Sequence, residues 1–273
     1  MSQAPSEPAL YHVSEGTIPV LVNVPHAGVH IPPAIAATMT PAALAVADTD
    51  WFADRLAAVA LAHGATLMTA THSRYVVDLN RDPTGTPLYP GADNTGLVPT
   101  TTFAHEPIYR DAPPDAAALA ERVGRYWMPY HDQLYAELAR MKVIHGIAVL
   151  LDVHSIPAHA PRFFDGRLPD LNLGSADGAS AAPALTARAW RVCTEAKGFS
   201  AVHDGRFKGG YITRRYGQPE QGVHALQIEI VQAAYMTEGP PWVWDEAKAR
   251  PLMAVLGAMV GTLADWVGHA AAA

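Results

Sequence analysis

The stretch IAVLLDVHS, residues Ile147–Ser155, opens with an unbroken apolar run and ends in Asp152, His154 and Ser155. A short apolar run of this kind is typical of a strand that is buried on both faces. Side chains two apart on a strand share a face, so Asp152 and His154 point to the same side. The stretch therefore predicts a central strand with polar, chemically competent groups at its carboxyl end.

Other short apolar runs alternate with longer helical patterns along the chain. The predicted strands cover Pro19–Val24, Ala65–Ala70, Tyr75–Leu79, Ile147–Val153 and Ala225–Val231. The predicted helices cover about Pro41–His63, Pro114–Met141, Pro183–Lys197 and Asp245–Val267. This alternation predicts an α/β layered fold with a largely parallel or mixed sheet.

We expect a single domain over residues 1–273, with an irregular segment at 1–15 and a frayed tail at 268–273. Two stretches, Asp82–Asp111 and Ile156–Ala182, are rich in Pro, Gly and Asp and are predicted to be long loops. Long loops inside a compact domain often form lids or binding walls, so both are expected near the active site.

The composition fits a compact globular protein, since 49% of the 273 residues are hydrophobic and 16% are charged. The net charge of −7 comes without a basic cluster, which argues against a nucleic-acid partner and favours a small-molecule substrate. The N-terminus does not read as a signal peptide and no apolar run approaches the ~20 residues that span a bilayer, so we expect a cytoplasmic protein without a membrane partner. Cys193 is the only cysteine, so any metal must be bound by His, Asp or Glu.

The segment VLVNVPHAG, at Val20–Gly28, repeats the pattern of an apolar strand that ends in a histidine, here His26. In open α/β sheets, ligands bind outside the carboxyl ends of the strands. Neutral imidazole is the commonest zinc ligand, and catalytic zinc sites combine His or carboxylate ligands with water. His26 and His154 are therefore predicted to converge on a metal, the alternative being that His26 only caps its strand.

A carboxylate is expected as the third ligand, and ADTDWFADRL, at Ala47–Leu56, offers Asp48, Asp50 and Asp54. Asp50 and Asp54 share one face of the helix predicted there. An Asp at a helix start is usually a cap, which is the alternative for Asp48 and Asp50 alike. Asp152 is a further candidate, either as a ligand or as the hydrogen-bond partner of a ligand histidine.

The segment SRYVVDLNRD, at Ser73–Asp82, places Asn80 and Arg81 at the end of a predicted strand that Arg74 opens. Arginine forms bidentate pairs with carboxylates, so this cluster predicts an anionic substrate. The alternative is a surface arginine that pairs with a nearby aspartate of the same segment.

The segment LQIEIVQAAY, at Leu226–Tyr235, carries Glu229 in the middle of a predicted buried strand. A buried Glu is costly unless it is paired, metal-bound or functional. Beside a zinc-bound water, such a carboxylate serves as general base and then passes the proton to the leaving amine. A structural Glu with satisfied hydrogen bonds is the alternative.

The segment GGYITRRYG, at Gly209–Gly217, bears Tyr211, Arg214 and Arg215 between glycines. The glycines predict a mobile closing loop whose Tyr and Arg side chains donate hydrogen bonds to oxyanions. Surface exposure is the alternative for at least one of the two arginines.

An ordered set of segments runs through the chain: NVPHAG, DTDW, SRYVVDLNRDP, LYPG, DVHS, GGYITRRYG and LQIEI. In this order and at these separations they resemble the N-formylglutamate amidohydrolase family, from about Val20 to about Leu263. The resemblance implies zinc-dependent hydrolysis of N-formyl-L-glutamate to glutamate and formate, the last step of one route of histidine degradation, in the cytoplasm. It also implies a three-layer α/β/α sandwich around a mixed sheet, as in zinc carboxypeptidases and aspartoacylase-like deacylases.

By this resemblance, PHAG makes His26 a zinc ligand, DVHS makes His154 another, and LQIEI makes Glu229 the catalytic carboxylate. Carboxypeptidases carry a Glu three residues after the first His, which this chain lacks. The resemblance therefore assigns the acidic ligand to Asp50 of DTDW, with Asp48 as the substitute.

In the mechanism that follows, zinc and an arginine stabilise the tetrahedral oxyanion. Arg74 is assigned this role, with Arg214 as the other candidate. Asn80, Arg81, Tyr211 and Arg214 are assigned to substrate binding. The expected partners are one divalent metal, zinc, and a small anionic N-formyl amino acid, in a monomer or small homo-oligomer. The alternatives are a zinc carboxypeptidase or another N-acyl amino acid deacylase with the same metal site, and a non-catalytic small-molecule binding protein on the same scaffold.

Overall fold

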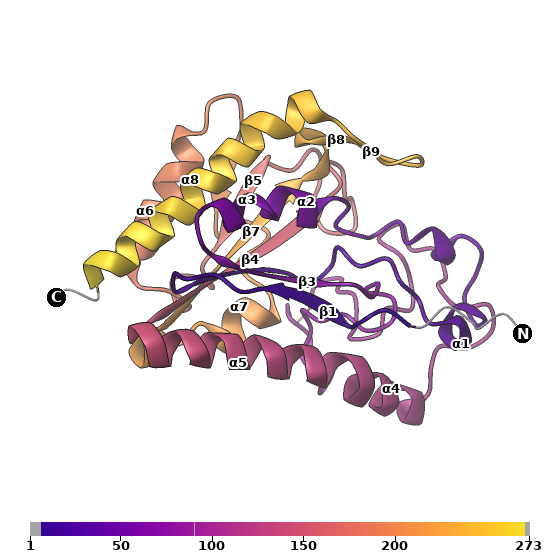
Figure 1. The fold of residues 1–273 in the computed structure, drawn as a ribbon. Helices are drawn as coiled ribbons and strands as arrows, with labels where there is room; N and C mark the ends of the chain where they lie inside the picture. Colours follow the sequence, from indigo (N-terminus) through magenta and orange to yellow (C-terminus); the bar gives the residue numbers. More distant parts are fainter. Residues whose placement is uncertain (1–6, 90, 271–273) are drawn as a thin grey trace, which may run out of the picture.

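A mixed, mostly parallel sheet forms the centre of the molecule in the computed structural model, which describes residues 7–89 and 91–270 (Figure 1). Its strands run in the order β1-β3-β2-β4-β7-β5-β6. They are β1 (Tyr11–Ser14), β2 (Val20–Val24), β3 (Thr66–Ala70), β4 (Ala148–Ile156), β5 (Leu171–Gly174), β6 (Ala201–His203) and β7 (Val223–Val231). The β1–β3 and β5–β7 pairs are antiparallel, and the other four pairs are parallel.

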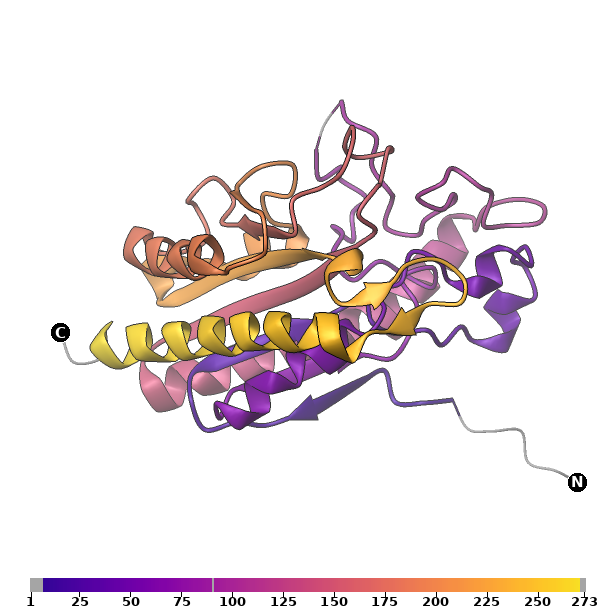
Figure 2. The ribbon, with the colours of Figure 1, turned by 90° about the horizontal axis from the view of Figure 1, so that it is seen from above.

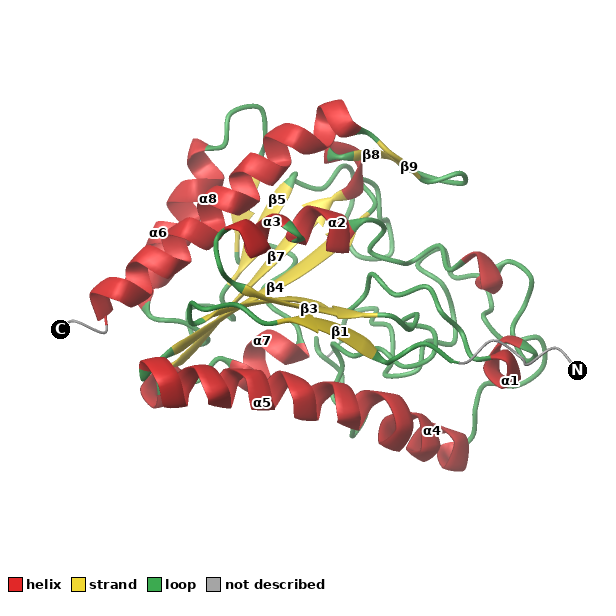
Figure 3. Ribbon diagram, in the orientation of Figure 1, coloured by secondary structure: helices red, strands yellow, loops and turns green. Residues whose placement is uncertain are grey.

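Helices cover both faces of this sheet (Figures 1 and 3). One face carries α2 (Ala53–Ala57), α3 (Val59–Ala62), α6 (Pro183–Glu195) and α8 (Glu246–Ala270). The other carries α4 (Ala116–Arg122), a π-helical turn (Val123–Trp127), α5 (Met128–His145) and α7 (Tyr211–Tyr216). The expected three-layer α/β/α architecture is therefore confirmed.

The smaller elements lie at the ends of the sheet and between its layers. They are α1 (Pro33–Ala36), η1 (Ala43–Ala45), η3 (Pro219–Gln221), η4 (Gln232–Ala234) and the β8–β9 hairpin (Met236–Thr237 and Val243–Trp244). Figure 2 shows α8 lying along the sheet, with this hairpin beyond its N-terminal end.

Burial on both faces of β4 explains why its first four residues, 148–151, are all apolar. Val149 and Leu151 belong to the core cluster beneath α8, whereas Ala148 and Leu150 belong to the cluster beneath α5. Asp152 and His154 continue the α5-side row beyond these apolar residues. The carboxyl end of the strand is therefore the point at which a buried apolar face becomes a buried polar one.

Helix α8 is long and apolar enough to cross a membrane by length and composition. Here it is a core helix, because Leu252, Leu256, Met259 and Leu263 are buried in the cluster that it forms with the sheet. Burial of these side chains supplies the apolar contact that holds α8 to the sheet.

Four predicted strands and three predicted helices are confirmed, with ends shifted by a few residues. The helix predicted from Pro41 to His63 is wrong, because the chain forms η1, α2 and α3 with a loop at 46–52. Val46 and Phe52 have positive φ angles of 46° and 60°, which a continuous helix does not tolerate. This loop carries Asp48 and Asp50 inward.

The strand predicted at Tyr75–Leu79 is also wrong, because the segment is a turn followed by irregular chain. Val76 N–H donates to the Ser73 carbonyl at 2.9 Å, and the buried Asp78 carboxylate accepts from the Asn80 amide at 2.9 Å. These bonds fold the backbone around a carboxylate. The apolar pattern reports burial here rather than an extended chain.

Four segments that were expected to be irregular contain regular structure. Residues 1–15 include strand β1, and Ile156–Ala182 includes strand β5. The segment expected to be a mobile loop at Gly209–Gly217 forms helix α7, whose Ile212 and Thr213 are buried. The tail expected to fray from residue 268 continues α8 to Ala270, and residues 271–273 lie outside the described part.

Candidate active site

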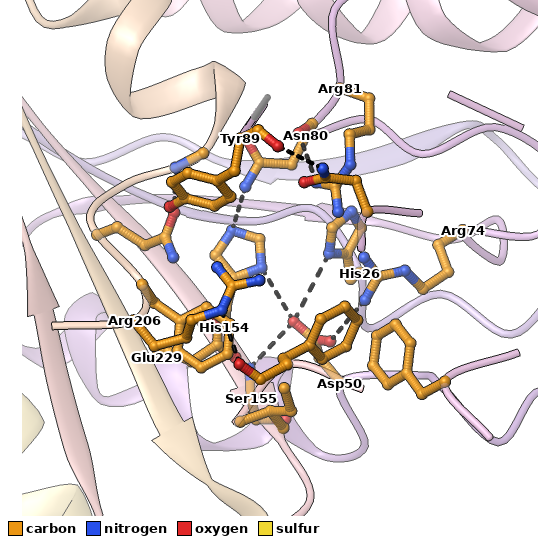
Figure 4. A pocket seen from close by; sticks show the side chains of 17 residues that line it. His26, Asp50, Arg74, Asn80, Arg81, Tyr89, His154, Ser155, Arg206 and Glu229 are labelled. Carbon is orange, nitrogen blue, oxygen red and sulfur yellow. Dashed lines mark hydrogen bonds and ion pairs between the residues drawn. The ribbon is translucent and has the colours of Figure 1, made fainter. Parts of the chain in front are cut away.

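A polar pocket lies where the carboxyl ends of β2, β4 and β7 meet the long loops (Figure 4). Both segments predicted to be long loops contribute to its wall, through Tyr89, Asn94, Phe103 and Phe163. Seven of the nine predicted site residues line it: His26, Asp50, Arg74, Asn80, Arg81, His154 and Glu229. Both long loops therefore lie at this candidate site.

Three of these residues converge closely enough to hold one metal ion. His26, Asp50 and His154 each offer a ligand atom, and the three atoms lie within 4.8 Å of one another. His154 Nδ1 lies 3.1 Å and His26 Nδ1 lies 3.8 Å from Asp50 Oδ2. Figure 4 shows both imidazole rings directed at this carboxylate.

Unsatisfied polar atoms at the same point support a cation there. His26 Nδ1 and Asp50 Oδ1 are buried without a hydrogen-bond partner among the described residues. A buried polar atom without a partner is costly, and a bound cation would satisfy both. The donor set of two imidazoles and one carboxylate suits zinc and other divalent transition metals.

Each histidine is backed by a second carboxylate on its other ring nitrogen. His26 Nε2 lies 2.8 Å from Asp78 Oδ1, and His154 Nε2 lies 2.9 Å from Asp152 Oδ2. A carboxylate that accepts the Nε2 proton leaves the Nδ1 lone pair free to bind a metal and fixes the ring orientation. Asp152 thus lies behind His154 and not among the three converging groups.

The geometry separates Asp50 from Asp48. Asp50 Oδ2 accepts the Ser155 amide at 3.1 Å beside His154, whereas Asp48 Oδ2 accepts the Phe103 amide at 2.8 Å. Neither caps a helix with its side chain, because α2 has Phe52 at its N-cap and no side-chain cap bond. The helix-cap alternative is therefore wrong for both residues.

The pKa shifts of His154 and Asp50 show that a positive charge is favoured between the three converging side chains. Burial alone would lower the pKa of the His154 imidazole, but the carboxylates of Asp152 and Asp50 outweigh burial and raise that pKa well above its usual value. Burial alone would raise the pKa of Asp50, but the neighbouring imidazoles of His154 and His26 lower it. A positive charge is therefore favoured between these groups, whether a proton or a metal carries it.

Glu229 lies next to this group through the register of the sheet. It pairs with His154 across the parallel β4–β7 ladder, so the two side chains leave the same face of the sheet at neighbouring positions. Its side chain lines the pocket, and burial raises the pKa of the carboxyl group to about 8. A metal cation at His154 would lower that pKa again.

A family model described as N-formylglutamate amidohydrolase matches residues 18–236. The chain belongs to this family. The N-formylglutamate deformylase of Pseudomonas aeruginosa is 46% identical over 252 residues, which cover 92% of this chain and 94% of the relative. That of Pseudomonas putida is 42% identical over 253 residues, with the same coverage of 92% and 94%. Membership in the N-formylglutamate amidohydrolase family confirms the expected resemblance and makes the chain an amidohydrolase.

Solved structures agree with this assignment. The crystal structure of N-formylglutamate amidohydrolase from Ralstonia eutropha JMP134 has a TM-score of 0.81 at 28% identity, over 96% of this chain and 99% of that chain. The gene product Atu2144 from Agrobacterium tumefaciens shares the fold, with a TM-score of 0.73 at 18% identity over 95% and 96% of the two chains.

In this member of the N-formylglutamate amidohydrolase family, Arg74 and Asn80 are held by protein groups at the pocket wall. Arg74 Nη2 lies 2.7 Å from Asp78 Oδ2, and Nη1 lies 3.6 Å from Asp50 Oδ1. Burial alone would lower the pKa of Arg74, but these carboxylates raise it, so the guanidinium stays charged. Asn80 Nδ2 lies 2.9 Å from His154 Nε2, and its Oδ1 accepts the Ile212 amide at 2.8 Å.

Tyr211 and Arg214 lie outside this pocket. Both line a neighbouring pocket that shares Arg81 with the first. Arg214 is exposed, and its Nε donates to the Gly209 carbonyl at 2.9 Å. The structure thus places Arg81 in the wall of both pockets, and Tyr211 and Arg214 in the wall of the neighbouring one.

Among the charged residues that line the pocket, Arg206 is the one that the sequence did not indicate. Its Nε donates to the Phe163 carbonyl at 2.8 Å, and its guanidinium lies 4.9 Å from the Tyr89 ring centroid. No carboxylate in the described part of the chain lies within ion-pair distance of it, whereas Arg162 pairs with Asp93 at 2.8 Å. An arginine in a loop ordinarily reads as a solvated side chain, so only the fold reveals that this one lines the pocket.

Proposed function

We propose that the chain hydrolyses N-formyl-L-glutamate to L-glutamate and formate with one divalent metal, zinc, bound by His26, Asp50 and His154. The observation that carries this proposal is the convergence of these three ligands beside Glu229 in a pocket with arginine in its wall. The names of the two Pseudomonas relatives support the substrate.

The protein groups divide the chemistry among them. A zinc ion held by the three ligands would lower the pKa of water to ~7 and polarise the formyl carbonyl. Glu229 accepts the proton of the attacking water and delivers it to the departing amine. Arg74 lines the pocket beside Asp50 and stabilises the negative charge that develops on the formyl oxygen.

Arg81 and Arg206 bind the carboxylates of the substrate in this proposal. Both line the pocket, and Arg206 has no carboxylate partner among the described residues. Arg206 thus takes the role predicted for Arg214, which lies outside. Asn80 acts as a positioning residue, because its Nδ2 donates at 3.5 Å to Asp152, the partner of His154, and its Oδ1 accepts the Ile212 amide of α7.

The substrate profile tests the proposal. N-Formyl-L-glutamate should be hydrolysed with a kcat/KM at least about 100-fold above that of N-acetyl-L-glutamate, N-acetyl-L-aspartate and short peptides, a preference worth about 2.7 kcal/mol. Activity should disappear on chelation and return with zinc. A preference for an acetyl or peptide substrate would identify a deacylase or carboxypeptidase instead, and turnover of none of them would favour a binding protein.

Replacing Arg206 with Gln should raise KM for N-formyl-L-glutamate by about 10- to 100-fold. This is the change expected when one charge-assisted hydrogen bond, worth about 1.5–3 kcal/mol, is lost. The variant should discriminate less against N-formyl-L-glutamine, whose side chain carries no charge. Steady-state kinetics with both substrates measure these changes. Arg214→Gln is the matched control and should leave KM unchanged; the reverse result would return the role to Arg214.

The physiological setting belongs to the same proposal. We place the reaction at the last step of a histidine degradation route, in the cytoplasm, and in a monomer or small homo-oligomer. The relatives' name supports the deformylase reaction itself. The single cysteine, Cys193, is buried and free, which fits a reducing compartment.

A further inference from the structure

A second group of side chains that could bind a metal lies just beyond the carboxyl ends of β2 and β3. Glu7, His30 and His72 each offer a ligand atom, and the three atoms lie within 4.8 Å of one another. None of them belongs to the His26, Asp50 and His154 group, and none lines the pocket described above.

The backbone holds the two imidazole rings together. His30 N–H donates to the Thr71 carbonyl at 3.0 Å, and Ser73 N–H donates to the His30 carbonyl at 2.9 Å. These bonds form a parallel bridge between His30 and His72 that prolongs the β2–β3 pairing. The ring centroids lie 4.8 Å apart at an interplanar angle of 82°.

Hydrogen bonding fixes which nitrogen of His72 carries the proton. Thr71 Oγ1 donates its single proton to the Ala9 carbonyl at 2.6 Å, so it can only accept from His72 Nδ1 at 2.8 Å. His72 Nε2 is then left with a lone pair. A metal-bound histidine shows the same arrangement, with the proton of its other nitrogen donated to a fixed oxygen.

This lone pair faces a carboxylate oxygen. His72 Nε2 lies 3.5 Å from Glu7 Oε1, and both His72 Nε2 and His30 Nε2 are buried without a hydrogen-bond partner among the described residues. His72 itself is only 6% exposed. An acceptor that faces a carboxylate with nothing between them is unfavourable, and a cation at this point would turn the repulsion into attraction.

The surroundings leave room for such a cation. Arg125 Nη2 pairs with Glu7 Oε2 at 2.7 Å, and the Tyr126 hydroxyl lies 3.5 Å from Oε1, so Oε1 keeps a free lone pair. The Glu7 side chain is 34% exposed, which gives an ion and its water ligands access from solvent. Protonation of His72 is the competing explanation, and burial of the ring disfavours the charged imidazolium.

We propose that Glu7, His30 and His72 form a second binding site for a divalent transition metal, with zinc as the first choice for two imidazoles and a carboxylate. Glu7 lies before strand β1, whereas His30 and His72 follow β2 and β3. The ion therefore fastens the N-terminal segment to the sheet, and its role is structural. The site does not depend on the proposed catalytic function.

Metal stoichiometry tests the second site. Full-length protein stripped with a chelator is titrated with Zn²⁺ and, for its absorption spectrum, with Co²⁺. Wild type should bind two equivalents, and Glu7→Gln and His30→Ala should each bind one while keeping deformylase activity. His12→Ala removes an exposed histidine of β1 and should still bind two.

Two results would overturn the second site: a wild type that binds one equivalent and loses it in Asp50→Asn, or two equivalents that survive both Glu7→Gln and His30→Ala. These variants are preferred because Glu7 and His30 are less buried than His72, whose ring packs against Tyr126. Asp50→Asn separates the two proposals, since it should lose the other ion together with activity and keep this one.

Discussion

Replacing Glu229 with Gln is expected to lower kcat for N-formyl-L-glutamate by about 100- to 10,000-fold, the contribution typical of a positioned general base. The amide has nearly the same size but cannot accept the proton of the attacking water. Glu229 lies across the β4–β7 ladder from His154 and lines the pocket, so the substitution removes the base without displacing a proposed ligand. KM and metal content should stay close to those of the wild type.

Steady-state kinetics and elemental analysis on the same samples check the Glu229 result. Glu220→Gln is the matched control. It makes the same chemical change at an exposed position just before β7. Turnover that survives in Glu229→Gln would assign the proton transfer to another group. A loss of zinc together with activity would show that Glu229 is a ligand instead.

Replacing Asp50 with Asn is expected to weaken binding of the catalytic metal by more than about 100-fold. Loss of a residue that only hydrogen-bonds a metal ligand costs up to about 100-fold, and loss of a ligand itself should cost more. Activity should fall with metal content and recover in part when zinc is added in excess. The physical reason is that, among the residues that the structure describes, Asp50 alone supplies a carboxylate oxygen within reach of both His26 Nδ1 and His154 Nδ1.

Asp48→Asn is the control for the metal-binding result, because Asp48 lies two residues away, is buried, and accepts a backbone amide from Phe103. It should keep its metal and most of its activity. Isothermal titration with zinc and elemental analysis measure both variants. Zinc lost in Asp48→Asn and retained in Asp50→Asn would exchange the two roles.

The two histidines could be predicted because the signal for each is local. An apolar run that ends in His26 or His154 specifies both the strand and the position of the side chain at its carboxyl end, where ligands bind in this class of sheet. Glu229 could be predicted for a similar reason, since a carboxylate inside a buried strand is costly unless it has a function.

The choice between Asp50 and Asp48 could not be made from local sequence. It depends on a loop with two residues at positive φ that replaces the expected helix, and neither Val46 nor Phe52 favours that conformation by itself. Tertiary contacts, such as the bond from the Ser155 amide to Asp50, hold the loop in place.

Arg206 could not be predicted, because it lies neither in a segment with a helical or strand pattern nor in one of the recognised motifs. It reaches the pocket only because Tyr89 and Phe163, from the two long loops, pack around it. Arg214, by contrast, lies in a segment that resembles the family pattern, yet it lines the neighbouring pocket, with its guanidinium 5.8 Å from the Tyr89 ring centroid.

The register that pairs His154 with Glu229 has a consequence for refolding experiments. A one-residue slip between β4 and β7 would turn Glu229 toward α8 and place an isoleucine beside His154, because side chains alternate between the faces of a sheet. Such a molecule would keep its strands and helices but would lack the base at the metal. The active fraction recovered after denaturation therefore counts the molecules with correctly aligned strands, which circular dichroism cannot do.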